Sequence, residues 1–352
     1  MTTVTLHLGD CLDIMRTLPA GSVDAVVTDP PYFRVKDEQW DRQWKNEGEF
    51  LAWLELAVME FQRILKPNGS LYLFASPAMS AKVEVMIGKY FLVINNIRWV
   101  KENGWHKKAD EAILRGYLSN WESIIFAEKF FSDDTAGQVY YTAVDGLHKK
   151  VYAPIGGYIK SERERAGYTR NDVEVALGYV SSTDPTRGTA LCYRWEEGSS
   201  LPTKEAYEKM RDFLNGGRKD YEYLRKDYED LRKDYEDLRK DYEDLRRPFM
   251  LGEKDTRYTP HTDTWNFPTV APSSDKHPAQ KPISMIEYII RVSTKKGATI
   301  LDAFAGSGTT GEAAYRTDRN AILIEKDAEY FKMAERRIRD AQAQPNLFEG
   351  QP

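Results

Sequence analysis

Residues 29–32 place a carboxylate, two prolines and a flat ring in direct succession: Asp29, Pro30, Pro31 and Tyr32. Consecutive prolines hold the backbone rigid and donate no hydrogen bond, so the carbonyl groups around them stay free to accept. Asp29 adds a carboxylate acceptor, and the ring of Tyr32 can stack on a planar substrate. Such acceptors suit an exocyclic amino group on a nucleobase. The alternative is that these residues merely end a strand in a turn.

A second candidate for chemistry is the glycine-rich segment 306–311, Gly-Ser-Gly-Thr-Thr-Gly, which follows an apolar run and precedes a predicted helix. It matches the dinucleotide-binding fingerprint, and Glu325 lies near the position expected for an acid that binds ribose hydroxyls. A nicotinamide-dependent enzyme is therefore one interpretation. Only about 40 residues follow this segment, too few to complete a dinucleotide-binding domain in its usual order. The rest of the sheet would have to come from N-terminal strands.

The order of the two motifs, with residues 29–32 first, a long insertion next and residues 302–308 last, resembles the beta class of DNA amino-methyltransferases. The resemblance covers residues 4–130 and 248–340. In that family an aspartate leads the catalytic tetrapeptide of adenine-N6 enzymes, whereas a serine more often leads in cytosine-N4 enzymes. The resemblance implies methyl transfer from S-adenosylmethionine to the N6 amino group of adenine in DNA. The alternatives are cytosine-N4 methylation and a DNA-binding regulator that kept the cofactor fold without catalysis.

The resemblance also assigns roles to individual residues of this chain. The catalytic residues are Asp29, Pro30, Pro31 and Tyr32. The residues expected to bind S-adenosylmethionine are Asp10, Cys11, Lys281, Asp302, Phe304, Ala305, Gly306, Ser307, Gly308, Thr309, Thr310 and Glu325. Phe304 is expected beside the cofactor, Glu325 on its ribose hydroxyls and Asp10 on its adenine. For Asp10, a plain helix cap is an equal alternative.

Apolar runs alternate with amphipathic segments on both sides of the insertion. Strands are predicted over residues 4–8, 23–27, 71–75, 91–100, 122–128, 298–303 and 321–324, and helices over 49–65, 77–89 and 283–293. This alternation predicts an α/β fold with a doubly wound, mostly parallel sheet, a Rossmann-like methyltransferase fold in permuted motif order. Both motifs are then expected at the carboxyl ends of adjacent strands, where such sheets bind ligands.

The chain is expected to divide into six parts. They are the first part of the catalytic domain (1–130), a linker (131–150), a target recognition region (151–216), a heptad-repeat helix (217–247), the second part of the catalytic domain (248–340) and a disordered tail (341–352).

Two segments are candidates for contact with DNA. The loop after residue 100 interleaves aromatic side chains with basic ones, among them His106, Lys107, Lys108 and Arg115. Such a loop can meet phosphates and stack on bases, and a solvated surface loop is the alternative. Residues 155–214 resemble a repressor-type helix-turn-helix domain, with a capping-box pattern at 169–172 and Trp-Glu-Glu-Gly at 195–198. The candidates there are Arg187, Thr189, Tyr193 and Arg194, and a helical domain without DNA contact is the alternative.

A seven-residue repeat, Arg-Lys-Asp-Tyr-Glu-x-Leu, occurs four times from residue 218 to residue 245. Its tyrosines and leucines occupy the two seam positions of a heptad, which predicts one long helix ended by Pro248. This helix is expected to act either as a strut on one body or as a coiled-coil homodimer, with the dimer modestly favoured.

Composition limits the class of protein. The chain of 352 residues is 41% apolar and has neither an apolar run of membrane-spanning length nor a signal-peptide pattern, which predicts a cytoplasmic globular protein without membrane contact. Cys11 and Cys192 lie far apart with no metal-ligand spacing, so neither a disulfide framework nor a metal site is expected. The net charge is −5, of which residues 218–245 contribute −3. The remainder is nearly neutral, and charge alone neither supports nor excludes DNA binding.

The C-terminal tail carries one further candidate. Gln344 to Phe348, Gln-Pro-Asn-Leu-Phe, resembles the pentapeptide with which bacterial proteins bind the sliding clamp. The apolar pair of Leu347 and Phe348 can act as a small anchor in an otherwise polar tail, and an inert tail is the alternative.

Overall fold

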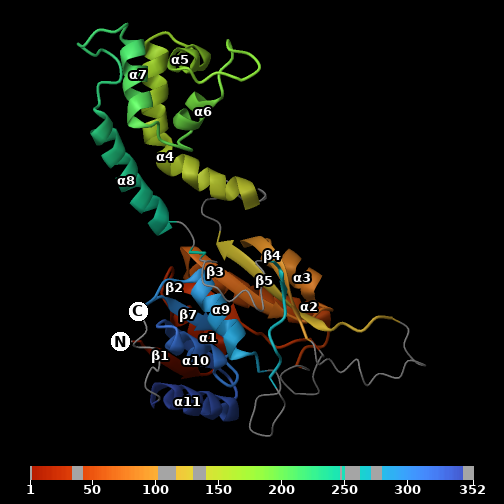
Figure 1. Ribbon diagram of the computed structural model, residues 1–352. Coiled ribbons are helices and arrows are strands. Elements are labelled where there is room, and N and C mark those ends of the chain that lie inside the picture. Colours follow the sequence, from red (N-terminus) through yellow and green to blue (C-terminus); the bar gives the residue numbers. More distant parts are fainter. Residues whose placement is uncertain are drawn as a thin grey trace. The chain divides into compact units, whose positions relative to one another are not determined.

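The computed structural model describes residues 2–33, 43–101, 116–129, 140–245, 248–249, 262–270 and 280–343. The chain forms two compact units, one from residues 1–137 and 247–352, the other from residues 138–246 (Figure 1). The first unit carries both sequence motifs, and the second is the insertion between them.

An eight-stranded sheet organises the first unit. Five neighbouring strands run parallel: β1 (Val4–Leu8), β8 (Asn320–Glu325), β7 (Thr299–Asp302), β2 (Val23–Thr28) and β3 (Leu65–Ala75). Next come β5 (Trp121–Lys129), antiparallel to β3, then β4 (Phe91–Val100), antiparallel to β5, and the short β6 (Thr264–Trp265) at the edge. From β2 the chain crosses to β3 on one side, and from β7 it crosses to β8 on the other. The predicted doubly wound, mostly parallel sheet is confirmed, and its switch point lies between β2 and β7.

Helices cover both faces of this sheet (Figure 1). α1 (Cys11–Thr17), α2 (Glu47–Ile64) and α3 (Ser80–Ile87) pack on one face, while α9 (Ile283–Ser293), α10 (Thr309–Arg316) and α11 (Ala328–Ala343) pack on the other. Along β2 the side chains alternate, so Val26 enters the first core while Ala25 and Val27 enter the second. Burial on both faces explains why the strand reads as a continuous apolar run.

The sheet differs from the sequence prediction at two places. Residues 66–69, predicted to end the preceding helix, belong to β3. The pairing of β2 with β3 shifts register between Val23 and Ala25, and this irregularity accommodates Pro67 and Gly69 within the strand. A Cβ on Gly69 would lie 2.7 Å from Leu65 Cδ2, so the chain is too close here for a larger residue. In addition, the short β6 is not among the strands predicted from the sequence.

The second unit is helical. It contains α4 (Tyr140–Arg165), α5 (Arg170–Leu177), α6 (Leu191–Glu196), α7 (Lys204–Leu214) and α8 (Tyr228–Leu245) around one apolar core. The predicted capping box is present, because Thr169 accepts from the Asp172 amide and Asp172 accepts from the Thr169 amide. The expected linker 131–150 is wrong in its second half, because α4 already begins at Tyr140. Apolar residues recur there at helical spacing, which Gly146 and Pro154 obscured.

The heptad helix is shorter than predicted, because α8 begins at Tyr228 and residues 218–227 are irregular, with several bends. The Asn215 side-chain oxygen accepts from the amides of Glu222 and Tyr223, at 2.7 and 3.0 Å, which holds the first repeat out of a helix. Leu224 adopts a positive φ of 49° and is fully buried in the core of the second unit. Leu231 is buried in the same core, and Tyr235 stacks on Tyr152 with ring centroids 4.8 Å apart. These seam residues therefore pack against their own unit.

Neither a membrane-spanning helix nor a metal-binding cluster occurs in the described part of the chain. No helix there is long and apolar enough to cross a bilayer. Within the same residues, no group of three or more His, Cys, Asp or Glu side chains is arranged to hold a metal ion.

Candidate active site

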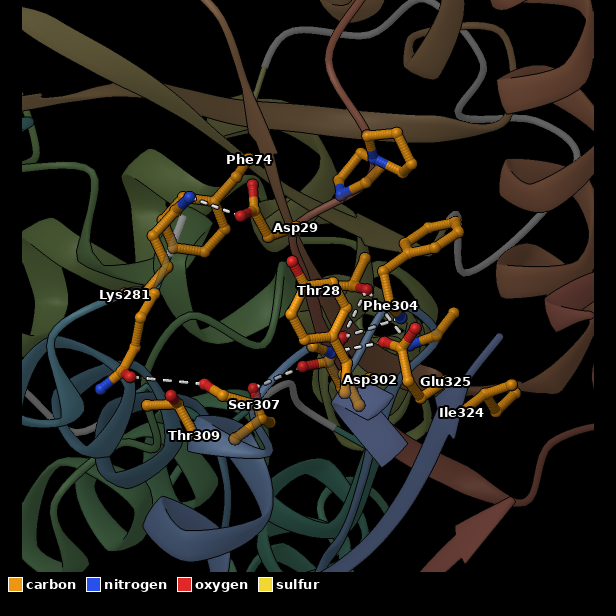
Figure 2. Close-up of a pocket in the computed structure, with 18 of the residues that line it drawn as sticks. Thr28, Asp29, Phe74, Lys281, Asp302, Phe304, Ser307, Thr309, Ile324 and Glu325 are labelled. Carbon is orange, nitrogen blue, oxygen red and sulfur yellow. Dashed lines mark hydrogen bonds and ion pairs between the residues drawn. The ribbon is translucent and has the colours of Figure 1, made fainter. Parts of the chain in front are cut away.

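A pocket of about 630 Å³ opens at the carboxyl ends of β2, β7 and β8, at the switch point of the sheet. Its wall brings together the two motifs, since residues 28–32 and residues 302–307, 309 and 310 line it, while Gly308 does not. Cavities of this size accommodate nucleotide-sized ligands. Figure 2 shows Asp29 and Asp302 at the ends of adjacent strands, with Thr28 beside Asp302.

Asp29 is a half-buried acid with one oxygen paired and the other left open. Its Oδ2 accepts from Lys281 Nζ at 2.5 Å (Figure 2). Its Oδ1 is also buried, yet it has no hydrogen-bond partner among the described residues. Burial raises the pKa of Asp29, and the charge of Glu122 adds to this, whereas Lys281 and the Tyr32 hydroxyl oppose it. An unpaired buried acceptor is costly, so this oxygen suits a donor brought by a ligand.

Lys281 belongs to the Asp29 end of the pocket. The sequence assigned it to the cofactor, but its ammonium group bridges two carboxylates, lying 2.5 Å from Asp29 and 3.3 Å from Glu122. The faces of two aromatic rings, Tyr32 and Phe74, lie 5.4 and 5.1 Å from it. Burial lowers the pKa of Lys281, but the two carboxylates outweigh burial and hold it above the ordinary value. Lys281 is therefore a charged partner of the motif at residues 29–32.

Glu122, at the start of β5, is a site residue that sequence reasoning missed. It accepts from the Tyr32 hydroxyl at 3.4 Å and pairs with Lys281 and Lys101. Burial raises the pKa of Glu122, but the two ammonium groups outweigh burial and keep it below the ordinary value. No motif marks this glutamate, because its position depends on how β5 pairs with β3 and β4.

Asp302 contrasts with Asp29 because the protein satisfies both of its oxygens. Oδ1 accepts from the Thr28 hydroxyl at 2.7 Å and from the Phe304 amide at 3.1 Å, and Oδ2 accepts from the Thr310 hydroxyl at 2.6 Å. Burial raises the pKa of Asp302 to about 6, although these hydrogen bonds oppose the rise. The sequence placed Asp302 on the cofactor. Its hydrogen bonds tie the glycine-rich loop to the end of β2.

The glycine-rich loop turns back between β7 and α10. Gly306 and Gly308 have φ of 51° and 79°, a region that favours glycine, and a Cβ on Gly308 would lie 2.9 Å from the backbone of Ala334. The Gly306 amide donates to Glu325 Oε2 at 2.7 Å, and Glu325 Oε1 accepts from the Asp327 amide at 2.8 Å. Burial raises the pKa of Glu325. Glu325, Ala305, Ser307 and Thr310 all line the pocket, and their binding of S-adenosylmethionine stays a prediction.

An arginine that the sequence analysis did not single out braces this loop. Arg337, on α11, donates to the Thr309 hydroxyl at 2.6 Å and to Gln280 Oε1 at 2.9 Å. Gln280 directly precedes Lys281 and accepts from Ser307 at 3.5 Å. Arg337 therefore links the segment that carries Lys281 to the start of α10.

Asp10 caps a helix, which is one of the two roles proposed for it, and it also lines the pocket; its contact with the cofactor adenine stays a prediction. Its Oδ1 accepts from the Leu12 amide at 3.0 Å, and its Oδ2 accepts from Lys326 at 3.2 Å. Cys11 is buried at the same wall, and burial raises the pKa of its thiol to about 12. The thiol is therefore neutral at physiological pH.

Phe304 also lines the pocket, and its ring centroid lies 5.6 Å from that of Trp53.

The predicted DNA-contacting residues fall into two groups. His106, Lys107, Lys108 and Arg115 lie outside the described residues. The other group lies on or just before α6 in the second unit, where Tyr193 is 45% exposed and Arg170 approaches its ring at 5.3 Å. The connection before α6 is fixed by Glu174, whose carboxylate accepts from the amides of Ala190 and Cys192, each at 2.8 Å.

Comparison with known proteins agrees with this geometry. Residues 23–336 match the family described as DNA methylase, of the N6/N4 methyltransferase type. DNA adenine methyltransferase YhdJ of Escherichia coli (strain K12) is 25% identical over 338 residues, covering 95% of this chain and 82% of that protein. Type II methyltransferase M2.LlaDCHI of Lactococcus lactis subsp. cremoris is 23% identical, covering 94% and 87%.

A solved structure shares the fold as well. The PvuII DNA methyltransferase, described as cytosine-N4-specific, superposes with a TM-score of 0.51 at 14% identity, covering 99% of this chain and 89% of that one. Together, the family match over most of the chain and the meeting of its two motifs in one pocket establish that the protein belongs to the N6/N4 DNA methylase family.

Proposed function

We propose that this DNA methyltransferase methylates the N6 amino group of adenine, with Asp29 as the residue that receives the amine. The observation that carries the proposal is the buried Asp29 Oδ1, an acceptor at the pocket wall without a partner among the described residues. An aspartate rather than a serine leads the tetrapeptide, which favours adenine over cytosine. The Escherichia coli relative named an adenine methyltransferase aligns over 95% of the chain, which supports the same choice.

The residues of the pocket suit S-adenosylmethionine. Glu325 offers a half-buried carboxylate for a ribose diol, although both of its oxygens also accept from backbone amides. Phe304, Ile324 and Cys11 supply apolar surface for a purine ring, and Asp10 lies on the same wall. When bound, S-adenosylmethionine supplies a methyl group on a positively charged sulfur, which a nitrogen lone pair can displace.

The contribution of the chain is orientation and charge. An adenine amino nitrogen is a poor nucleophile, because its lone pair is delocalised into the ring. Asp29 Oδ1 and the Pro30 carbonyl each accept one N–H bond from it, which favours a pyramidal nitrogen with its lone pair directed at the methyl group. The proton that the nitrogen sheds after methylation passes to Asp29 Oδ1. The raised pKa of Asp29, caused first by burial, suits this acceptor role. The base must first leave the duplex, and the ring of Tyr32 is available to stack on it.

Product identity tests the proposal. Duplex DNA of mixed sequence is incubated with methyl-labelled S-adenosylmethionine and digested to nucleosides. We expect the label in N6-methyladenine for the wild-type protein and no label for Asp29→Ala. Label in N4-methylcytosine would contradict the proposal and favour the alternative amino group.

We further propose that the second unit helps to select the methylation site. Arg187, Thr189, Tyr193 and Arg194 lie on or just before α6, and residues of this type can contact phosphates and base edges. Replacing Arg187 and Arg194 with alanine should change the pattern of methylated sites while leaving cofactor binding intact. An unchanged pattern would show that the second unit does not take part in site recognition.

A homodimer through the heptad repeat would need surfaces other than Leu231 and Tyr235, which pack within the second unit.

We also propose a binding partner for the C-terminal tail and a location for the protein. Gln344 to Phe348 lie outside the described residues and remain a predicted clamp-binding segment. A peptide of residues 341–352 that fails to bind the sliding clamp at high micromolar concentration would dispose of this idea. Because the substrate is DNA, we propose that the protein acts in the cytoplasm.

A further inference from the structure

The Asp29 end of the pocket contains a cluster of buried and half-buried charged side chains that the proposed chemistry leaves unexplained. Asp29 follows β2, Glu122 opens β5, Lys101 follows β4, and Lys281 precedes α9. Side chains from four separate parts of the first unit thus converge on one spot. Burying so many charges costs free energy unless each is paired, and the pairing is therefore informative.

Lys281 is the centre of this cluster. Its ammonium group lies 2.5 Å from Asp29 Oδ2 and 3.3 Å from Glu122 Oε2, so it holds two carboxylates at once. Its side chain is only 7% exposed, so the surrounding residues leave it little room to adopt another conformation. Because Asp29 is paired through Oδ2, its Oδ1 is the oxygen left open.

Glu122 is held from three directions. Lys281 and Lys101 pair with it, and the Tyr32 hydroxyl donates to its Oε2 at 3.4 Å. The ammonium of Lys101 also lies 4.9 Å from the ring centre of Trp99, so an aromatic ring and a carboxylate hold it together. Glu122 therefore shares the positive charge of Lys281 with Asp29.

We infer that Glu122 and Lys281 are positioning residues that set the orientation and the basicity of Asp29. Lys281 keeps Asp29 ionised and turned so that Oδ1 can accept from the target amine. Glu122 divides the attraction of Lys281 between two carboxylates, so Asp29 stays basic enough to take up a proton after transfer. This inference rests on the proposed function and assigns new roles to two residues around its central acid.

Lys281 and Glu122 have opposite effects on the pKa of Asp29. Lys281 lowers the pKa of Asp29 and Glu122 raises it, on top of the larger effect of burial. The other groups near Asp29 are the Tyr32 hydroxyl, which lowers its pKa, Lys101 beyond Glu122, and Asp302 on the neighbouring strand. Removing the lysine and removing the glutamate should therefore move the titration of Asp29 in opposite directions.

The test is the pH dependence of single-turnover methyl transfer by the full-length protein, with saturating cofactor and DNA. For Lys281→Met, we expect the acidic limb of the profile to move to higher pH. For Glu122→Gln, we expect it to move to lower pH, with a several-fold lower plateau because Asp29 becomes a weaker base. Glu122→Asp, which keeps the charge, should restore the limb toward that of the wild type.

The matched controls come from a surface ion pair of the same residue types. Lys89 and Glu55 lie 2.8 Å apart on the outside of the first unit, so Lys89→Met and Glu55→Gln should leave the limb unmoved. A limb that moves in the same direction in both pocket variants, or in neither, overturns the inference. If Lys281→Met does not fold, Glu122→Gln decides alone, since an unmoved limb there also overturns it. Absence of transfer by the wild-type protein would instead refute the proposed function.

Discussion

Asp29 and Asp302 are two aspartates at the carboxyl ends of adjacent parallel strands, the first half-buried and the second buried, and they differ in what surrounds them. Asp302 accepts three hydrogen bonds from Thr28, Phe304 and Thr310. Asp29 pairs through one oxygen and leaves the other open. A carboxylate whose acceptors are all satisfied within the protein holds structure together. One with an open acceptor is prepared for a ligand, and burial makes its vacancy costly until that ligand arrives.

The partners of the two acids differ in charge as well as in number. Neutral hydroxyl and amide groups surround Asp302, so burial dominates and raises its pKa to about 6. Asp29 faces the ammonium of Lys281, which opposes the effect of burial. The same residue type, placed on neighbouring strands, is thereby suited to two tasks.

The largest effect is expected from Asp29→Asn. The amide can still occupy the space of the carboxylate, but it cannot provide a charged acceptor to the target amine. Loss of one such transition-state contact costs on the order of 10² to 10³ in rate. Single-turnover transfer should fall by at least that factor, while cofactor affinity stays within a few-fold. Asp302→Asn serves as the matched variant, and an equal loss of rate in both would erase the difference between the two acids.

A smaller effect, on stability rather than rate, is expected from Asp302→Ala. The Thr28 and Thr310 hydroxyls would lose their shared acceptor inside a buried site. Breaking such a network costs about 2–4 kcal/mol of unfolding free energy. Urea denaturation measures the loss, and Asp302→Asn should retain most of the stability because its amide can bond both hydroxyls. Full stability of the alanine variant would refute a structural role for Asp302.

The pH dependence of stability should carry the signature of Asp302. Its pKa is raised from 3.8 to about 6 in the folded protein, so the folded state binds the proton more tightly than the unfolded state. The wild type should therefore gain stability relative to Asp302→Asn as the pH falls from 7 toward 4, by roughly 2–3 kcal/mol. Denaturation of both proteins at several pH values measures this gain. A constant difference between them would show that Asp302 does not titrate in this range.

The smallest effect is expected at the brace behind the glycine-rich loop. Arg337→Met removes the hydrogen bonds to Thr309 and Gln280 but leaves the alkyl part of the side chain. We expect cofactor affinity to fall by several-fold, since each hydrogen bond is worth about 1 kcal/mol, with little change in the transfer rate at saturating cofactor. Titration calorimetry with S-adenosylmethionine measures the affinity. A large loss of rate at saturation would instead connect Arg337 to the Asp29 end of the pocket through Gln280 and Lys281.

Much of the first unit was predictable because its signals are local. Continuous apolar runs mark strands buried on both faces, and residues 29–32 and 306–311 mark the ends of two of them. Glu122, which belongs to no motif, was not predictable, because it enters the pocket through the pairing of β5 with its neighbours. Lys281 was predicted as a site residue but assigned to the cofactor, because its partner Asp29 lies 252 positions away in the sequence. Long-range pairing of this kind leaves no local pattern.

For the seven-residue repeat the prediction was wrong for the opposite reason, because tertiary contacts override a strong local pattern. The first repeat has almost the same sequence as the others, yet Asn215 binds its backbone and Leu224 enters the core in a left-handed conformation. Packing and two side-chain hydrogen bonds outweigh the helical preference of these residues.

The central claim, that the open oxygen of Asp29 receives the target amine, can be tested by a double-mutant cycle between protein and DNA. One axis is Asp29→Asn, and the other replaces the target adenine with purine, which lacks the amino group. Binding of each pair is measured in the presence of a non-reactive cofactor analogue, so that the easier flipping of purine cancels between the two proteins. We expect a coupling free energy of roughly 1.5–3 kcal/mol, the range for a hydrogen bond to a charged group. A coupling indistinguishable from zero would contradict contact between Asp29 and the amine.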